Sequence, residues 1–315
     1  MKKIVVVGEI LAEIMADSTG AGFMEPITLT GPFPSGAPAI FVDQAAKLGQ
    51  PSAIISTVGN DDFGRINLDR LKTDGVDVSA VRIDDDRPTG TAFVRYRENG
   101  SRDFVFNIRH SACGLLSLND AMQAMLAEAD HFHVMGSSLS SPEFVALNVD
   151  TALAVKKRGG TISFDPNLRK EMLDAPGMRA AMMKILTVTD LFLPSDSELT
   201  LLTKADSDAE AVQELLDLGI AAIVHKLGVK GVHFYNGNDD IFVPAFTVEE
   251  VDPTGAGDSF GGTFTTFWLR GTDIVEALTL ATAAGALAVT KRGPMEGTSD
   301  LETLDHFVST QRKTS

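Results

Sequence analysis

The segment 251–262, VDPTGAGDSFGG, combines residue types and spacing that suit the transfer of a phosphoryl group. Gly255 and Gly257 let the backbone turn tightly and leave no side chain in the way of an approaching group. The apolar periodicity that follows predicts a helix starting here, so free N–H groups and the positive end of the helix dipole converge on one point. Asp258 lies in the first turn, where its carboxylate can accept the proton of a hydroxyl whose oxygen attacks phosphorus.

A purely structural interpretation of this segment has to be weighed against the chemical one. Glycine-rich turns before helices are common, and an aspartate in a first turn is an ordinary partner of the helix dipole. The segment is not a Walker A loop, because no G-K-[ST] occurs in the chain. It is not the dinucleotide-binding G-x-G-x-x-G either, because the third glycine is displaced to Gly261. Its length, and the other motifs of the chain, favour the chemical interpretation.

Short apolar runs alternate with helix-length periodic segments along most of the chain. Runs that are this short and almost entirely apolar are typical of parallel strands buried on both faces. The alternation predicts an α/β fold, with a central, mainly parallel sheet covered by helices on both sides. The predicted strands are Ile4–Val7, Ala53–Val58, His131–Met135, Thr161–Phe164, Leu191–Leu193 and Ala221–His225. The predicted helices between them are Ala37–Leu48, Gly64–Lys72, Leu118–Glu128, Glu143–Arg158, Met178–Leu186 and Ala209–Leu216.

Two insertions interrupt the alternation and predict a small antiparallel β lid. Thr89–Glu98 and Asp103–Ile108 are expected to pair around Asn99-Gly100, a strong hairpin signal. Ala12–Thr30 is also expected to be extended and irregular. The predicted division is a large α/β domain, 1–11, 34–87 and 113–315, and a lid, 12–33 and 88–112.

The end of the chain departs from the alternating pattern as well. Beyond Asp240 we expect a short strand pair that ends at Asp252-Pro253. Two long helices should follow, Gly255–Leu269 and Asp273–Thr290.

Composition excludes several classes of function. The 315 residues are 44% hydrophobic, enough for a large core, and 43 acidic against 27 basic residues give a net charge of −16. Such a chain repels phosphate backbones and anionic lipid, so we expect neither a nucleic-acid nor a membrane partner. Cys113 is the single cysteine, which excludes an internal disulfide framework. No apolar run reaches the length of about 18 residues that a membrane span needs, and none resembles a secretory signal, so a cytoplasmic location is expected.

Three motifs together resemble the ribokinase/PfkB family of carbohydrate kinases. DPTGAGDSF at 252–260 is similar to the family's D-T-x-G-A-G-D-x-F. PSGAPAIFVDQAAKLG at 34–49 resembles G-G-A-P-x-N-x-A-x-x-x-x-x-L-G, and VGNDDFG at 58–64 matches V-G-x-D-x-F-G. The resemblance runs from Gly8 to Gly293 and implies a ribokinase-like three-layer α/β sandwich with a lid.

The resemblance also implies an activity, the ATP-dependent phosphorylation of a sugar hydroxyl. The implied base is Asp258, and the N–H groups of Gly255, Ala256 and Gly257 form the implied anion hole. Mg²⁺ accompanies ATP in this chemistry and bridges its phosphates.

The nucleotide side is implied by two further segments. KLGVKG at 226–231 resembles the family's K-L-G-x-K-G, so Lys226, Gly228 and Gly231 are implied to bind the nucleotide. Ser195 and Glu198 stand where the family has N-x-x-E. Glu198 keeps the carboxylate implied to organise Mg²⁺ through water, whereas Ser195 lacks the usual amide for a direct phosphate contact.

Asp252 and Thr254 are implied to hold a monovalent cation such as K⁺ through their oxygens, as in some relatives. Thr254 is also implied to contact the nucleotide.

On the substrate side, the chain resembles the branch that contains fructokinases and 2-keto-3-deoxygluconate kinases. GEILAE at 8–13 is similar to G-E-x-L-x-D, with Glu13 where aspartate is usual, and Ser35 departs from a Gly-Gly pair. FDPNLR at 164–169 matches F-D-P-N-x-R, and RHSA at 109–112 resembles R-x-x-S-A. The implied substrate-binding residues are Glu13, Gly36, Arg109, Asp165, Asn167, Arg169 and Asp258.

Two points about this side stay open from the residues themselves. Arg169 can clamp a substrate carboxylate or a phosphate, or it can lie in a solvated turn. Tyr96 and Arg97 lie on the lid hairpin, and the strand register decides which of them faces the sugar.

The predicted function is the phosphorylation of a ketose or keto-sugar acid of the 2-keto-3-deoxygluconate, fructose or tagatose type. The alternatives are a nucleoside kinase of the same family and a non-catalytic sugar-binding regulatory protein on the same scaffold. Relatives often pair through their lid sheets, so a homodimer is also expected.

Overall fold

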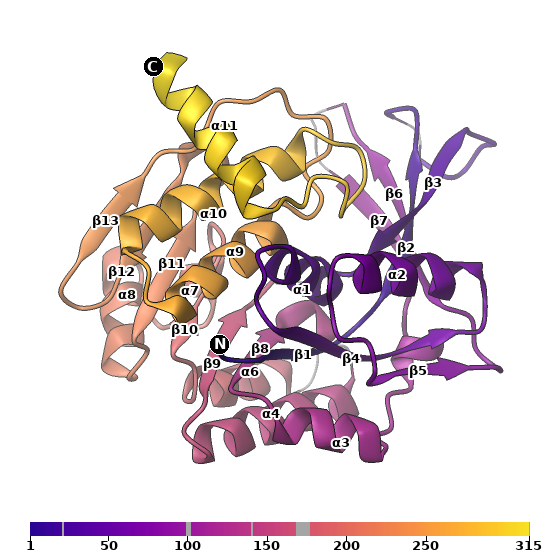
Figure 1. Cartoon of the computed structure of the whole chain (residues 1–315), viewed down its shortest axis with the longest axis horizontal. Helices are drawn as coiled ribbons and strands as arrows, with labels where there is room; N and C mark the ends of the chain where they lie inside the picture. The colour runs from indigo at the N-terminus through magenta and orange to yellow at the C-terminus, as the bar shows by residue number, and fades with distance from the viewer. Residues whose placement is uncertain (21, 99–101, 140, 168–176, 315) are drawn as a thin grey trace.

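A nine-stranded sheet forms the centre of the computed structural model, which describes residues 1–20, 22–98, 102–139, 141–167 and 177–314 (Figure 1). The strand order is β13-β12-β11-β10-β9-β8-β1-β4-β5, and every neighbouring pair from β11 to β5 is parallel. The six predicted strands are confirmed to within one residue at each end. The strands are β1 Ile4–Val7, β4 Ser52–Gly59, β5 Val81–Asp84, β8 His131–Met135, β9 Thr161–Asp165, β10 Leu191–Phe192, β11 Ala222–Lys226, β12 Val232–Tyr235 and β13 Asp240–Val243.

Helices cover both faces of the sheet, because alternate side chains of its central strands enter opposite cores. Val5 and Val7 pack into one core, and Ile4 and Val6 pack into another on the opposite face. The first face is covered by α3 Asp120–Ala127, α4 Pro142–Lys157, α6 Met178–Leu186, α7 Glu198–Leu201 and α8 Asp208–Asp217. The second is covered by α1 Ala37–Lys47, α2 Asp62–Thr73, α9 Ala256–Arg270, α10 Ile274–Val289 and α11 Leu301–Thr314. The predicted three-layer α/β architecture is therefore confirmed.

A second sheet stands beside the large body as the expected lid (Figure 1). Its order is β3-β2-β6-β7, with β2 Leu11–Ala16, β3 Leu29–Ser35, β6 Gly90–Tyr96 and β7 Arg102–Asn107. The sheet is mixed rather than purely antiparallel, because β2 and β6 pair in parallel. Each of these two strands follows a strand of the parallel body, β1 and β5, so both leave the same edge and run in the same direction. The predicted hairpin pairing of β6 with β7 is confirmed, while its Asn99-Gly100 turn lies outside the described residues.

Other expectations need correction or stay open. The strand pair expected beyond Asp240 lies earlier in the chain, because β13 Asp240–Val243 pairs with the preceding strand β12 Val232–Tyr235. It does not extend to Asp252-Pro253, because Pro244 has no N–H to continue the ladder. The edge strand β5 and the terminal helix α11 were not predicted from the sequence. The domain limits 12–33 and 88–112 stay a prediction. Within the described ranges, no helix is long and apolar enough to cross a membrane.

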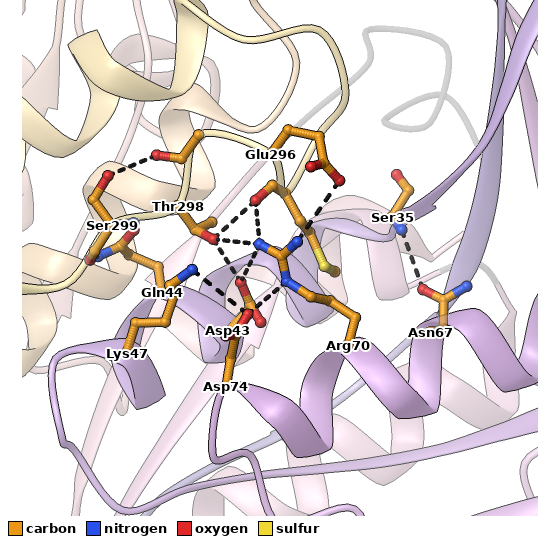
Figure 2. Close-up of polar contacts among 12 residues, drawn as sticks. Ser35, Asp43, Gln44, Lys47, Asn67, Arg70, Asp74, Glu296, Thr298 and Ser299 are labelled. Atoms are coloured by element: carbon orange, nitrogen blue, oxygen red, sulfur yellow. Dashed lines mark hydrogen bonds and ion pairs between the residues drawn. The ribbon is translucent and has the colours of Figure 1, made fainter.

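A polar network ties the C-terminal segment 295–299 to helices α1 and α2 (Figure 2). The carboxylate of Asp43 is fully buried and accepts from Thr298 Oγ1 at 2.7 Å. The Arg70 guanidinium lies 3.7 Å from Asp43, donates to Thr298 Oγ1 at 3.0 Å, and pairs with Asp74 at 2.5 Å. Burial raises the pKa of Asp43 to about 7, against the lowering influence of Arg70. The segment after Gly293, which borders the start of α9, is thus held by a charge pair inside the protein.

Replacing Arg70 with methionine should leave the buried Asp43 without its cation. We expect the free energy of unfolding to fall by about 3 kcal/mol at pH 8, as when one partner of a buried pair is removed. The loss should be smaller at pH 5, because the pKa of Asp43 near 7 leaves this carboxyl protonated there in the folded protein. Urea unfolding at the two pH values measures both quantities.

Arg65→Met is the matched control, since Arg65 lies on the same helix and forms an exposed pair with Asp62. Its loss should stay below about 1 kcal/mol at either pH. An equal loss for Arg70→Met at pH 5 and pH 8 would show that the charge of Asp43 does not govern this network.

Candidate active site

Helix α9 begins with an uncapped N-terminus at the predicted phosphoryl site. Gly255 has φ 82°, and a Cβ built on it would lie 2.3 Å from the Pro294 carbonyl oxygen, so no other residue fits there without strain. No side chain caps this end of the helix. The backbone N–H groups of its first turn therefore keep their hydrogen-bonding capacity and the positive end of the dipole. Asp258 lies in that turn, so the structure brings together the four predicted residues Gly255, Ala256, Gly257 and Asp258.

A buried lysine–aspartate pair lies beside this helix start. Lys226 ends β11 and Asp165 ends β9, at the same carboxyl edge of the parallel sheet. Lys226 Nζ lies 2.5 Å from Asp165 Oδ2. A Cβ built on Gly257 would be 3.7 Å from Lys226 Nζ, so the ammonium group reaches the first turn of α9. The pairing of Lys226 with Asp165 was not predicted, because the sequence motifs assign Lys226 to the nucleotide and Asp165 to the sugar.

The charges around the site perturb one another. Burial and the charge of Asp165 raise the pKa of Asp258 to about 8, while Lys226 opposes this rise. Burial alone would lower the pKa of Lys226, but Asp165, Glu198 and Asp258 together raise it above its ordinary value. Lys226 therefore stays an ammonium group at neutral pH, and Asp258 titrates in the range where a general base works best.

Glu9 is a buried carboxylate that sequence reasoning did not place in the site. It follows β1 and accepts from Ser137 Oγ and Ser138 Oγ, each at 2.7 Å. Burial raises the pKa of Glu9, although the hydrogen bonds from the two hydroxyls lower it. The charge of Glu9 in turn contributes to the raised pKa of Asp258. The available signal was a carboxylate directly after the first buried strand, at the edge where α/β proteins bind ligands.

Four of the five residues predicted to bind the nucleotide lie around the ends of β10 and β11, and the fifth, Thr254, lies in the loop before α9. The Ser195 N–H donates to Glu198 Oε2 at 2.7 Å, and Ser195 forms a parallel bridge with Lys226. Gly228 has φ 55° and open space around its Cβ position. Gly231 has φ 123°, and a Cβ there would lie 2.2 Å from the Val243 carbonyl oxygen. The predicted nucleotide residues are therefore neighbours of the Lys226 site, and the two glycines adopt backbone angles that other residues avoid.

Asp252, the predicted monovalent-cation ligand, is fully buried and surrounded by donors. Its Oδ1 accepts from the Thr254 N–H at 3.0 Å, from Thr254 Oγ1 at 2.8 Å and from Tyr96 OH at 3.0 Å. Its Oδ2 accepts from the Gly293 N–H at 3.1 Å. A K⁺ ion at Asp252 and Thr254 would share these oxygens with four hydrogen bonds, so this ligand set stays a prediction.

On the substrate side, the two departures from the family pattern contact each other. Ser35 Oγ donates to Glu13 Oε2 at 2.9 Å, and both side chains are buried. The Ser35 N–H donates to Asn67 Oδ1 at 3.2 Å, which fixes the end of β3 to α2 (Figure 2). Gly36 has φ 112°, and a Cβ there would lie 2.5 Å from the Glu9 carbonyl oxygen. Ser35 and Glu13 therefore form one hydrogen-bonded pair, and the two departures from the family pattern occur together.

The remaining predicted substrate residues are placed differently. The Asn167 N–H donates to Asp165 Oδ1 at 3.1 Å, so this residue, with φ 38°, fixes the carboxylate that holds Lys226. Arg109 lines an open cavity of about 610 Å³ between the start of α2 and the lid, and the lining does not include the residues of the α9 turn. Arg169 lies outside the described residues. Tyr96 rather than Arg97 faces the body, as its bond to Asp252 shows.

Named relatives align with nearly the whole chain. The chain is 32% identical over 301 residues to probable fructokinase-5 of Arabidopsis thaliana, with 92% of each chain covered. It is 31% identical over 303 residues to 2-dehydro-3-deoxygluconokinase of Thermoproteus tenax, with 94% of this chain and 91% of the relative covered.

Solved structures agree with the expected ribokinase-like fold. An E. coli protein provisionally named ribokinase II, solved with ATP and Mg²⁺, matches with a TM-score of 0.93 at 47% identity over 98% of this chain and 100% of that chain. A double-mutant fructokinase of Vibrio cholerae O395, solved with fructose, ADP and potassium ion, matches with a TM-score of 0.83 at 29% identity over 98% of both chains. The model of the pfkB family carbohydrate kinases matches residues 1–301. The chain therefore belongs to the pfkB family of carbohydrate kinases, enzymes that transfer a phosphoryl group to an alcohol.

Proposed function

We propose that this kinase phosphorylates a hydroxyl of a ketose or keto-sugar acid, of the 2-keto-3-deoxygluconate, fructose or tagatose type, with Mg·ATP. The observation that carries the proposal is the uncapped start of α9 with Asp258 in its first turn and Lys226 beside it. The named relatives act on fructose or 2-dehydro-3-deoxygluconate, which supports this substrate class.

In the proposed reaction, the hydroxyl oxygen of the sugar forms a bond to the γ-phosphorus of ATP. The bond from that phosphorus to the oxygen bridging to the β-phosphate breaks, and ADP leaves. The proton of the hydroxyl passes to Asp258, and the N–H groups of Gly255, Ala256 and Gly257 stabilise the negative charge on the phosphoryl oxygens. The ammonium group of Lys226 balances negative charge on the phosphoryl group. Asp165, which Asn167 orients, fixes the position of Lys226.

The nucleotide would lie along Lys226, Gly228 and Gly231, with Ser195 and Thr254 near its phosphates. Within the described part of the chain, no three histidine, cysteine or acidic side chains gather closely enough to hold a metal by themselves. Mg²⁺ would therefore take most of its ligands from ATP and water, with Glu198 orienting that water. When bound, the ion neutralises charge on the phosphates.

The sugar would lie between the body and the lid. Glu13, Gly36, Asp165 and Asn167 are the described candidates for its contacts, and Arg109 and Arg169 stay predictions. The buried Ser35–Glu13 hydrogen bond occupies space that a Gly–Asp pair would leave open, so we expect a pocket that differs from that of a typical fructokinase.

A homodimer that forms through the lid also stays a prediction. Val105 and Phe106 on β7 and Leu29 on β3 are exposed apolar side chains of the lid, which supports it.

A panel of ketoses, aldoses, sugar acids and nucleosides with Mg·ATP tests the proposal. We expect the highest kcat/KM for a ketose or keto-sugar acid, measured by coupled ADP release. Asp258→Asn should lower kcat on the best substrate by about 10²–10⁴-fold, because the variant keeps the shape of the base without its proton affinity. Turnover of only nucleosides would contradict the substrate class, and a loss below about tenfold in Asp258→Asn would contradict the assignment of the base.

The pH dependence follows from the raised pKa of Asp258. A base must be unprotonated to act, so kcat/KM should increase with pH up to a plateau above about pH 8, the pKa given by burial and by Asp165. At still higher pH, kcat/KM should decrease only once Lys226 loses its proton. That point lies well above neutral pH, because the neighbouring carboxylates raise the pKa of Lys226. Steady-state rates from pH 5 to pH 10 measure the profile. A profile that is already flat at pH 6 would show that Asp258 is ionised there in the free enzyme.

A further inference from the structure

The lid strands β6 and β7 contact the loop that leads into α9. Tyr96 and Arg102 are directly opposite each other across β6 and β7, so their side chains leave the same face of the sheet. Tyr96 OH donates to Asp252 Oδ1 at 3.0 Å, and Arg102 Nη1 donates to Thr254 Oγ1 at 2.6 Å. The lid therefore reaches the residue directly before Gly255, where the uncapped turn begins.

Arg102 differs from the other arginines of this hairpin in its partners. Arg95 and Arg97 each pair with Asp103 at 2.7 Å. Within the described ranges, no carboxylate lies within ion-pair distance of Arg102, whose nearest polar partner is the neutral hydroxyl of Thr254. The guanidinium also lies over the Phe104 ring, 5.6 Å from the ring centroid, a contact that uses none of its N–H donors in a conventional hydrogen bond. A partly buried guanidinium with five N–H donors and one neutral acceptor therefore has donors left for an anionic ligand.

The charge of Arg102 already acts on the proposed reaction centre. It is one of the two cations that lower the pKa of Asp258, the other being Lys226. Lys226 comes from the body of the protein and contacts the first turn of α9, and Arg102 comes from the lid and contacts the loop before it.

We propose that Arg102 is a further catalytic residue, whose guanidinium binds the phosphoryl group during its transfer. This inference rests on the proposed role of the α9 turn. Because the hairpin carries Arg102, the full positive charge is in place only when the lid lies over the loop 252–254. When the lid is open, the site lacks the charge of Arg102, so transfer of the phosphoryl group to water is slower. Transfer to the sugar takes place with the lid closed and with that charge in place.

A purely structural latch is the competing explanation, and the two make different predictions. A latch needs only the hydrogen bond to Thr254, which lysine can also donate, so it predicts that Arg102→Met weakens binding of a transferring phosphoryl group no more than binding of ADP alone. A catalytic guanidinium binds the phosphoryl group itself, so Arg102→Met should weaken that binding selectively, and lysine should restore part of the lost activity although its single ammonium lacks the planar fork.

The test compares Arg102→Met and Arg102→Lys with the wild-type enzyme on its best sugar. We expect Arg102→Met to lower kcat by about 10²–10³-fold, the usual effect of removing one donor to a developing charge, with KM for the sugar within about threefold. Arg102→Lys should recover at least about tenfold of that loss. The acid limb of kcat/KM should move to higher pH in Arg102→Met, because the lost charge lowers the pKa of Asp258 in the wild type.

Arg97→Gln is the matched control, because Arg97 lies on the same hairpin with its side chain 54% exposed, and Arg95 still pairs with Asp103. Its kcat should stay within about threefold of the wild type.

A binding measurement keeps the test independent of the choice of sugar. Mg·ADP with aluminium fluoride mimics the phosphoryl group in transfer, and analogues of this kind bind far more tightly than ground-state ligands. Calorimetry should show at least tenfold weaker binding of this complex to Arg102→Met, with binding of Mg·ADP alone within about threefold.

Equal binding of both ligands to Arg102→Met and to the wild type would overturn the proposal. So would a loss of kcat that lysine does not recover and that leaves the pH profile unmoved. A different result would show that the α9 turn is not the phosphoryl site. In that case the wild-type enzyme would bind the fluoride complex no more tightly than Mg·ADP.

Discussion

The free N-terminus of α9 is the feature on which the rest of the site depends. A helix usually satisfies its first N–H groups with a capping side chain, and here Gly255 takes that position with none to offer. The turn is possible because φ 82° suits glycine, and because the Pro294 carbonyl packs where a Cβ would be. The segment that carries Pro294 is itself anchored by Arg70 and Asp43 through Met295 and Thr298. A buried ion pair between α1 and α2 thus supports the turn that begins α9.

The carboxyl edge of the parallel sheet supplies the charges that face this helix. Asp165 and Lys226 come from β9 and β11, and their pairing keeps two otherwise costly buried charges in place. Glu9, which follows β1, adds a second acidic group. Burial and these carboxylates raise the pKa of Asp258 to about 8, and the cations Lys226 and Arg102 oppose that rise. The base is therefore tuned by residues from four elements far apart in the sequence.

Much of this architecture could be predicted from the sequence, for identifiable reasons. Strands such as Ile4–Val7 are buried on both faces, so their periodicity is unambiguous, and the Gly255–Asp258 motif determines a local turn. The parallel pairing of β2 with β6 could not be predicted, because it depends on where two separate insertions leave the body. The Lys226–Asp165 pair and the lid contacts of Tyr96 and Arg102 are likewise set by tertiary structure, with no local signal in the sequence. The strand expected to run up to Asp252-Pro253 ends at Val243, because Pro244 has no N–H to continue the ladder.

The central claim is that backbone N–H groups at the start of α9 bind the phosphoryl group that is transferred. A crystal structure with Mg²⁺, a non-hydrolysable ATP analogue and the best sugar tests it most directly. The account predicts γ-phosphate oxygens within about 3 Å of the backbone nitrogens of residues 255–257, with the acceptor hydroxyl beside the Asp258 carboxylate. A γ-phosphate bound elsewhere, with those nitrogens facing only water or protein, would contradict it.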